Sequence, residues 1–254
     1  MPHRSRHGGR HELGQNFLVH PPTIARIVAL VAETEGSILE LGAGDGALTA
    51  PLARLGRDLT AIDIDEHRVG ALRRRLSGVR VEQADATRHP FDRAVVVGNV
   101  PYHVTTPILR RLLDRDGWSR AVLLTQWEVA RKRAGVGGGT MMTAQAAPWF
   151  VFDLHGRVPA SAFRPAPSVD GGILGITRRG SPLVPPGERP AYERFVRRLF
   201  TARGRGIVAN VREAVGMDRA RARAALSRAG IDADRLPRDL APGQWVALWR
   251  TLGR

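Results

Sequence analysis

The residues best suited to chemistry lie at positions 98–107, Gly-Asn-Val-Pro-Tyr-His-Val-Thr-Thr-Pro. Four apolar residues precede them and predict a buried parallel strand. Pro101 cannot continue a strand and biases Val100 away from the helical region. We therefore expect a rigid turn that carries Asn99 and Tyr102 at the carboxyl end of the strand, where open α/β sheets bind ligands.

This turn has the groups needed to hold the amino group of an adenine. The side-chain oxygen of Asn99 and the carbonyl of Val100 can each accept one N–H, and Tyr102 can stack on the base, which is worth about 1–3 kcal/mol. With both hydrogens directed at acceptors, the nitrogen lone pair is free to face a methyl donor. The sequence predicts a catalytic turn made of Asn99, Val100, Pro101 and Tyr102. The alternative is an ordinary turn in which Asn99 caps the backbone and Tyr102 packs.

A glycine-rich turn earlier in the chain predicts a nucleotide-type cofactor. It follows a predicted strand at 37–41 and includes Gly42, Gly44 and Gly46, which allow the backbone to approach a ligand closely. Asp63 lies near the end of the next predicted strand, 59–64, about 20 residues further on, where a carboxylate accepts hydrogen bonds from ribose hydroxyls. On physical grounds this arrangement fits NAD and S-adenosylmethionine equally well. A turn that binds no ligand is the third alternative.

Two further residues are candidates for the same site. Asp85 follows the predicted strand 79–83, where it can accept the amino group of the cofactor's adenine, although a solvated turn aspartate has the same signature. Phe163 begins the extended segment Phe-Arg-Pro-Ala-Pro-Ser and is expected to be exposed, as the second face of a base clamp opposite Tyr102. Core packing of Phe163 is the alternative.

The charge of the chain predicts a polyanionic partner. The net charge is +15, and residues 178–254 contain 17 Arg against 7 acidic residues. Such an excess favours nucleic acid, with the last third of the chain as the surface that contacts phosphates. A solvated helix face is the alternative for each run of charge. The basic residues predicted to bind RNA are Arg131, Lys132, Arg133, Arg164, Arg194, Arg197, Arg198 and Arg205.

Alternating strand and helix patterns predict an α/β fold, with a Rossmann-like sheet that has helices on both faces and a small all-helical C-terminal domain. The predicted domains are a basic flexible arm at 1–12, a cofactor-binding catalytic domain at 13–180 and a helical RNA-binding domain at 188–254. Further strands are expected at 94–97, 121–125, 149–157 and 171–178. Helices are expected at 23–31, 47–55, 105–113, 126–133, 190–203, 206–216, 218–228 and 242–252.

Several classes of protein and site are excluded or disfavoured. The chain has no cysteine, which excludes disulfides and cysteine metal sites. No stretch approaches the ~20 apolar residues of a membrane span, and the basic N-terminus lacks the apolar core of a secretory signal. We expect a cytoplasmic protein without a metal, and nothing in the sequence demands more than a monomer.

A series of motifs along residues 11–179 resembles the rRNA adenine N6-dimethyltransferases, a family of class I methyltransferases. The motifs are Gln15-Asn16-Phe17-Leu18, Glu40 to Gly46, Asp63-Ile64-Asp65, Asp85, Gly98 to Tyr102 with Thr105-Thr106, and Phe163 to Asp170. The segment from Gln126 to Gly135 and the arginine-rich C-terminal part are most similar to the Erm branch.

The resemblance implies S-adenosylmethionine as cofactor and one adenine of 23S rRNA as substrate, with resistance to macrolide, lincosamide and streptogramin B antibiotics as the result. It implies cofactor contacts at Asn16, Leu18, Gly42, Asp63, Asp85 and Asn99, and base stacking by Tyr102 and Phe163. Many relatives have Glu at the position of Asp63, so Asp65 is a nearby alternative for the ribose contact.

Four other functions are compatible with parts of the sequence. The nearest is a housekeeping dimethyltransferase of small-subunit (16S) rRNA, which shares most of these motifs. A DNA adenine methyltransferase would use a similar turn but needs a sizeable target-recognition region, for which about 70 residues of helices leave little room. An NAD-dependent dehydrogenase would need a Tyr-Lys pair or a suitably placed catalytic His, and neither stands out. An RNA-binding factor without chemistry would not need the glycine turn, Asp63 and Asn99.

Overall fold

The computed structural model describes residues 16–253, so the arm predicted at 1–12 lies outside the described residues. The chain forms two compact units. Unit 1 contains the residues up to Ala130 together with Asp153–Thr177, and unit 2 contains Arg131–Phe152 together with Arg178–Arg254. The segment 131–152 thus belongs with the C-terminal helices, although the sequence places it inside the predicted catalytic domain.

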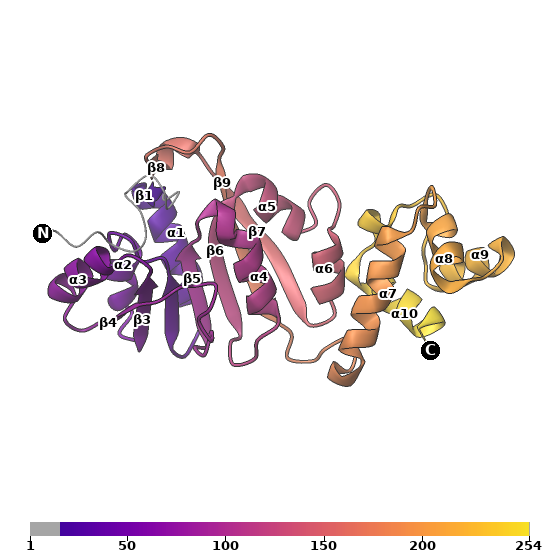
Figure 1. Cartoon of the computed structure of the whole chain (residues 1–254), viewed down its shortest axis with the longest axis horizontal. Coiled ribbons are helices and arrows are strands. Elements are labelled where there is room, and N and C mark those ends of the chain that lie inside the picture. The colour runs from indigo at the N-terminus through magenta and orange to yellow at the C-terminus, as the bar shows by residue number, and fades with distance from the viewer. Residues whose placement is uncertain (1–15, 254) are drawn as a thin grey trace, which may run out of the picture. The chain divides into compact units, whose positions relative to one another are not determined.

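The main sheet has seven strands within the described residues, in the order β4-β3-β2-β5-β6-β9-β7 (Figure 1). The first five strands of this order are parallel, and β9 runs antiparallel to β6. The strands are β2 (Ile38–Leu41), β3 (Leu59–Asp63), β4 (Arg80–Gln83), β5 (Val95–Asn99), β6 (Arg120–Gln126), β7 (Phe150–Val158) and β9 (Gly171–Arg178).

The order of the central strands creates the position for a ligand. Strand β2 lies between β3 and β5, so the chain moves outward from β2 in opposite directions on its two sides. Every residue of β2 and β3 is buried, as expected for parallel strands covered on both faces. The carboxyl ends of β2 and β5 meet at this switch point, which is where doubly wound sheets bind ligands.

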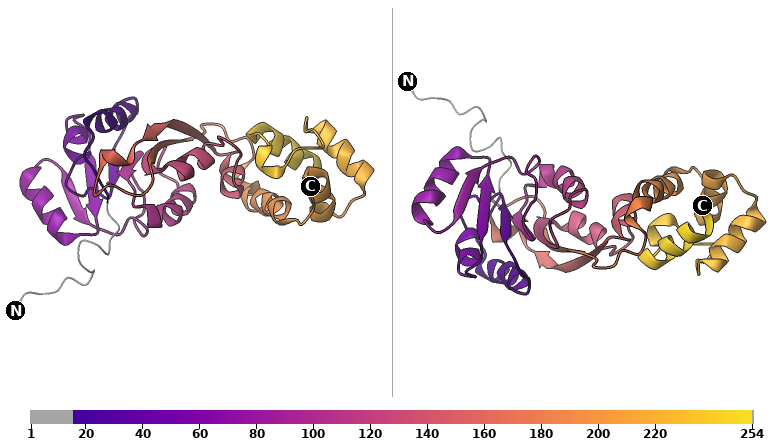
Figure 2. Two further views of the ribbon diagram at one scale, coloured as in Figure 1. Left: turned by 90° about the horizontal axis from the view of Figure 1, so that it is seen from above. Right: turned by 90° about the horizontal axis from the view of Figure 1, so that it is seen from below.

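Helices lie on both faces of the sheet, which confirms the predicted fold class (Figure 2). They are α1 (Pro21–Ala32), α2 (Thr49–Ala53), α3 (Glu66–Arg75), α4 (Thr105–Leu113) and α5 (Trp127–Arg133). The prediction for 105–113 is confirmed to the residue. Helix α3 was not predicted, although it begins with a sequence signal: the Asp65 side chain caps it by accepting from the N–H groups of His67 and Arg68.

A second, two-stranded sheet pairs segments far apart in the chain. Strand β1 (Phe17–Leu18) runs antiparallel to β8 (Phe163–Arg164), with Phe17 opposite Arg164 and Leu18 opposite Phe163. Leu18 and Phe163 enter the hydrophobic core with Ile27 and other residues of unit 1. The pairing carries Asn16 and Phe17 to the carboxyl edge of the main sheet.

Unit 2 is built from helices whose aromatic side chains pack together. Tyr192 makes edge contacts with Trp149 and Trp249, and its buried hydroxyl donates to the carbonyl of Ala144 at 2.9 Å. The carbonyl belongs to α6, so the segment 131–152 is tied to the C-terminal helices. These helices are α6 (Met141–Ala146), α7 (Arg189–Thr201), α8 (Ile207–Val215), α9 (Arg219–Arg228) and α10 (Pro242–Leu252).

Candidate active site

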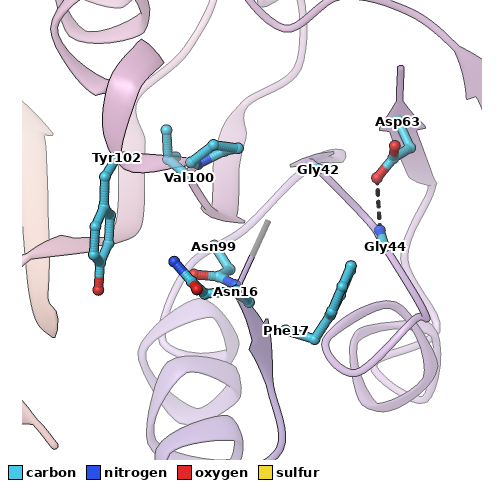
Figure 3. A pocket seen from close by; sticks show the side chains of 9 residues that line it. Asn16, Phe17, Gly42, Gly44, Asp63, Asn99, Val100 and Tyr102 are labelled. Atoms are coloured by element: carbon cyan, nitrogen blue, oxygen red, sulfur yellow. Dashed lines mark hydrogen bonds between the residues drawn. The ribbon is translucent and has the colours of Figure 1, made fainter. Parts of the chain in front are cut away.

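A cavity of about 390 Å³ lies at the switch point of unit 1 (Figure 3). It joins four segments that the sequence singled out separately: Asn16 and Phe17 of the N-terminal motif, the glycine turn after β2, Asp63 at the end of β3 and the turn after β5. Its lining residues are Asn16, Phe17, Gly42, Gly44, Asp63, Asn99, Val100, Pro101 and Tyr102. The structure thus brings the whole predicted catalytic turn and most of the predicted cofactor residues to one place.

The amide of Asn99 has a defined orientation in this cavity. Its Nδ2 donates a hydrogen bond to the backbone carbonyl of Asn16 at 2.7 Å. The Oδ1 is therefore the atom left to accept hydrogen bonds from a ligand. The backbone N–H of Val100 donates to the Leu124 carbonyl of β6 at 2.9 Å, which fixes the turn that follows Asn99.

Tyr102 opens a short 3₁₀ turn (η1, Tyr102–Val104) and lies across the cavity from the glycine turn (Figure 3). Its hydroxyl is buried and has no hydrogen-bond partner among the described residues. Burial, with the nearby charge of Asp170, raises the pKa of Tyr102 to about 12. The phenol therefore stays neutral at physiological pH, and the ring offers a flat, uncharged face.

Asp63 supports the glycine turn with both of its carboxylate oxygens. Its Oδ2 accepts from the N–H of Gly44 at 2.8 Å, and its Oδ1 accepts from the N–H of Asp65 at 2.9 Å. Burial raises the pKa of Asp63, and these two hydrogen bonds and the charge of Arg68 oppose that rise. Because a carboxylate has about four acceptor sites, two remain for ribose hydroxyls. Asp65, the alternative, instead caps α3 and lines neither cavity described here.

The turn itself depends on its glycines and on Phe17. Gly42 and Gly44 have φ values of +68° and +54°, which favour glycine. A Cβ on Gly44 would lie 3.3 Å from the Phe17 ring. The guanidinium of Arg68 lies over that ring, 4.1 Å from its centroid, and also forms an ion pair with Asp45 of the turn. Phe17 is therefore held between the glycine turn and helix α3.

A second cavity of about 590 Å³ shares Gly42, Asp63, Val100 and Pro101 with the first. Its lining is largely apolar, which suits a purine ring. Asp85 lies in it, oriented by hydrogen bonds from the N–H and hydroxyl of Thr87 at 2.8 and 2.6 Å. The remaining lining residues are Leu41, Ile64, Ala84, Ala86, Thr87, His103, Val104 and Ile108.

Two predicted site residues lie elsewhere. Leu18 is 4 % exposed, belongs to the core and lines neither cavity. Phe163 is 0 % exposed, so the expectation of an exposed ring is wrong. Both are explained by the β1–β8 pairing, which turns these side chains inward onto Ile27 and its neighbours. Phe163 packs in the hydrophobic core of unit 1 and lines neither cavity.

Glu40 is a residue near the site that the sequence reasoning gave no role. Glu40 is the penultimate residue of β2. Its side chain is 1 % exposed and faces Thr49 of α2. Burial raises the pKa of Glu40 to about 8. An acidic residue inside an otherwise apolar strand, directly before a glycine turn, is the signal by which it could have been found.

Two of the predicted RNA-binding residues hold a loop within unit 2. Arg131 donates to the carbonyl of Val136 at 3.2 Å, and Arg133 donates to the hydroxyl of Thr140 at 2.6 Å. Lys132, between them, is exposed. The other predicted positions are also exposed, namely Arg164 in unit 1 and Arg194, Arg197, Arg198 and Arg205 in unit 2.

The basic charge is concentrated in unit 2. That unit contains 20 Lys and Arg residues against 7 Asp and Glu, whereas the rest of the chain has 19 against 17. Within residues 16–253 no group of three or more His, Asp or Glu side chains could hold a metal ion. The described helices include none long and apolar enough to cross a membrane.

Comparison with known proteins gives consistent matches over nearly the whole chain. Residues 6–252 match the family model described as ribosomal RNA adenine dimethylase. An rRNA adenine N-6-methyltransferase of Corynebacterium diphtheriae is 53% identical over 203 residues, which are 78% of this chain and 80% of that protein. The mycinamicin-resistance protein MyrB of Micromonospora griseorubida is 47% identical over 247 residues, covering 96% and 79%. The crystal structure of the 23S rRNA methyltransferase ErmE superimposes with a TM-score of 0.83 at 34% identity, covering 94% of this chain and all of that one.

Proposed function

The chain belongs to the ribosomal RNA adenine dimethylase family, and we propose that it transfers methyl groups from S-adenosylmethionine to N6 of one adenine in 23S rRNA. The similarity to a mycinamicin-resistance protein and to a 23S rRNA methyltransferase supports this substrate over 16S rRNA. Modification of that adenine would confer resistance to macrolide, lincosamide and streptogramin B antibiotics. Because the chain belongs to this family, we set aside the alternatives of an NAD-dependent dehydrogenase and a DNA adenine methyltransferase.

The two cavities fit the parts of S-adenosylmethionine. The second cavity offers apolar walls for the adenine ring and Asp85 as an acceptor for its amino group. Asp63 lies where the cavities join and has acceptor sites for the ribose. The first cavity, between Asn16, Gly44 and Asn99, receives the methionine end. When bound, the cofactor supplies a methyl group on a sulfonium, which is already an activated leaving group.

The observation that carries the proposal is the hydrogen bond from Asn99 Nδ2 to the Asn16 carbonyl. This hydrogen bond leaves Oδ1 of Asn99 to accept one N–H of the target amine, and in the proposed reaction the Val100 carbonyl accepts the other. The Tyr102 ring stacks on the base. Held in this way, the amine nitrogen presents its lone pair toward the first cavity, so positioning supplies most of the acceleration.

Asn99, Val100, Pro101 and Tyr102 carry no general base. His103 follows them and lines the second cavity, but the proposed reaction needs no base. Bound S-adenosylmethionine would supply the methyl group: its C–S bond would break as the N–C bond forms, and the electron pair would stay on sulfur in the neutral thioether product. The nitrogen becomes acidic only after it has gained the methyl group, and its extra proton then passes to solvent. The role of Asn99 and Val100 is to orient the amine before the transfer.

The substrate is recognised by charge as well as by the cavity. A flipped adenine leaves its stack at least cost from a loop or bulge. We propose that the exposed arginines of unit 2 contact RNA phosphates, with Lys132 and Arg164 as further contacts. The protein is expected to act as a monomer in the cytoplasm, where ribosomal RNA is assembled.

Transfer of labelled methyl to deproteinised 23S rRNA and, separately, to 30S particles tests the proposal. We expect label in 23S rRNA, and a loss of at least about 100-fold in kcat for the Asn99→Ala variant, since it removes the oriented acceptor. Arg74→Ala, an exposed residue of α3, is the matched control. Label only in 30S particles would instead assign the housekeeping function, and label in neither from a folded protein would leave an RNA-binding factor.

A further inference from the structure

Two aromatic residues occupy equivalent places at the ends of neighbouring strands. In the parallel pair β5 and β6, Asn99 is the partner of Leu124. Tyr102 and Trp127 stand three residues beyond these partners, and each opens a helical turn. Because adjacent strands are about 4.8 Å apart, the two rings start from neighbouring positions on the carboxyl edge of the sheet. Tyr102 has a role in the proposed reaction, but Trp127 has none so far.

Trp127 forms a layered pair with an arginine from another strand. The guanidinium of Arg157, in β7, lies over the indole ring at 5.5 Å from its centroid. The Nε of Arg157 donates to Oδ2 of Asp170 at 2.6 Å, which fixes the plane of the guanidinium. The side chain of Arg157 is nevertheless 62% exposed, so a flat, positively charged surface faces solvent above Trp127.

Asp170 forms hydrogen bonds with both members of this pair. Its backbone carbonyl accepts from the N–H of Trp127 at 2.8 Å, and its Oδ1 accepts from the N–H of Ala160 at 2.8 Å. Its charge is also close enough to Tyr102 to contribute to the raised pKa of that phenol. Since Asn99 and Leu124 are partners, the strand register places Trp127 beside the turn of Tyr102, and the hydrogen bonds of Asp170 hold Trp127 and Arg157 together there.

We propose that Trp127 and Arg157 form a second stacking platform, which binds the nucleobase adjacent to the target adenine in the RNA. This inference rests on the proposed function and deepens it. Aromatic rings and arginine planes both bind unpaired RNA bases by stacking. When the target adenine moves onto Tyr102, its neighbour loses a stacking partner, and the platform replaces that partner. Phe163, the residue first expected to supply a second ring, is buried and does not compete for this role.

Conservative replacement of Arg157 tests the platform on the full chain. The Arg157→Lys variant keeps the charge and loses the plane, so we expect kcat/KM for a 23S rRNA fragment to fall about 10-fold while the Kd for S-adenosylmethionine is unchanged. Trp127→Leu should give a similar loss. Arg178→Lys is the matched control, because the Arg178 guanidinium also lies over a ring, that of Phe150 at 4.9 Å. Arg178 comes directly after Thr177, which pairs with Arg120 at the amino end of β6. It therefore lies at the edge of the sheet opposite to the carboxyl edge, where Trp127 lies.

A second measurement identifies the bound group. The methylated adenine is first mapped by primer extension, and each neighbouring nucleotide is then replaced by an abasic one. For one of these abasic RNAs, kcat/KM of the wild-type protein should be about 10-fold lower than for the intact fragment. The kcat/KM of Arg157→Lys should be the same for that abasic RNA as for the intact fragment. Equal activity of Arg157→Lys and wild type on the intact fragment, or additive losses on the abasic RNA, would overturn the platform alone. A wild-type protein that binds S-adenosylmethionine but methylates no RNA would overturn the proposed function and the platform with it.

Discussion

At the scale of single residues, Glu40 is expected to lower the free energy of unfolding as the pH rises, because its pKa is higher in the folded chain than in the unfolded one. Burial raises its pKa from 4.5 to about 8, so between these values the folded chain holds a proton that the unfolded chain has lost. Raising the pH in this window therefore favours unfolding, by about 1.4 kcal/mol per pH unit from this one group. Below the window both states are protonated, and the penalty disappears.

The Glu40→Gln variant tests this dependence, because glutamine has a similar size and no charge. Its free energy of unfolding, measured in denaturant from about pH 5 to about pH 9, should rise relative to wild type by about 1.4 kcal/mol per unit up to about pH 8 and level off above it. Glu33→Gln, at an exposed position, is the control. A constant difference between Glu40→Gln and wild type at every pH would mean that Glu40 is not protonated in the folded chain.

Arg68 is expected to act on the cofactor through Phe17. Its guanidinium covers the Phe17 ring and pairs with Asp45, so the Arg68→Ala variant should leave Phe17 less well held over the glycine turn. We predict a Kd for S-adenosylmethionine about 5- to 10-fold weaker by calorimetry, with kcat at saturating cofactor close to wild type. Arg74→Ala, on the same helix and exposed, should bind as wild type does. A loss of kcat with unchanged Kd would assign Arg68 a different role.

The sequence predicts site residues well where their role depends on position after a strand. Asn99, Tyr102 and Asp63 each follow from a strand end and a turn signal, and the structure brings them to one cavity. The exposure of a side chain is harder to predict from sequence, because it depends on which distant segment of the chain covers that side chain. Nothing near Phe163 in the sequence indicates that Leu18 will pair with it across about 145 residues.

At the scale of secondary structure, elements with a clear apolar period are predictable, whereas helix α3, which buries only Val69 and Leu72, and the shortest elements are not. The parallel strands and the four C-terminal helices have clear patterns. Strands β1 and β8 have two residues each, and α6 has six, which is too short for a period to show. These short elements are stabilised by tertiary contacts, such as the hydrogen bond from Tyr192 to Ala144 of α6.

The two tyrosines of the chain allow this tertiary contact to be measured. Tyr192→Phe removes a buried hydrogen bond between α7 and α6, so the free energy of unfolding should fall by about 1 kcal/mol. Tyr102→Phe removes a hydroxyl that has no partner among the described residues, so its stability should be unchanged or slightly higher. Unfolding of both variants and the wild type in denaturant measures these changes in the free energy of unfolding. Equal losses would show that the Tyr192 hydroxyl contributes nothing specific to unit 2.

At the scale of the whole molecule, the two units differ in charge and in the function that we propose for each. Unit 1 contains the cavities and is almost balanced in charge, whereas unit 2 has the basic excess. The composition predicts this asymmetry directly, since counting residues requires no structure. The composition does not show that the segment 131–152, with its three basic residues, belongs to the same unit as the C-terminal helices.

This asymmetry predicts how RNA affinity responds to salt. Each phosphate contact adds about 0.7 to the slope of log K against log salt for single-stranded RNA. Replacing Arg194, Arg197 and Arg198 together by glutamine should therefore lower the measured slope by about 2 and leave the Kd for S-adenosylmethionine unchanged. The control triple, Arg54, Arg74 and Arg80 to glutamine, removes the same charge from exposed positions of unit 1. If both triples lowered the slope equally, net charge alone would drive binding; a drop confined to the α7 triple assigns phosphate contact to that helix.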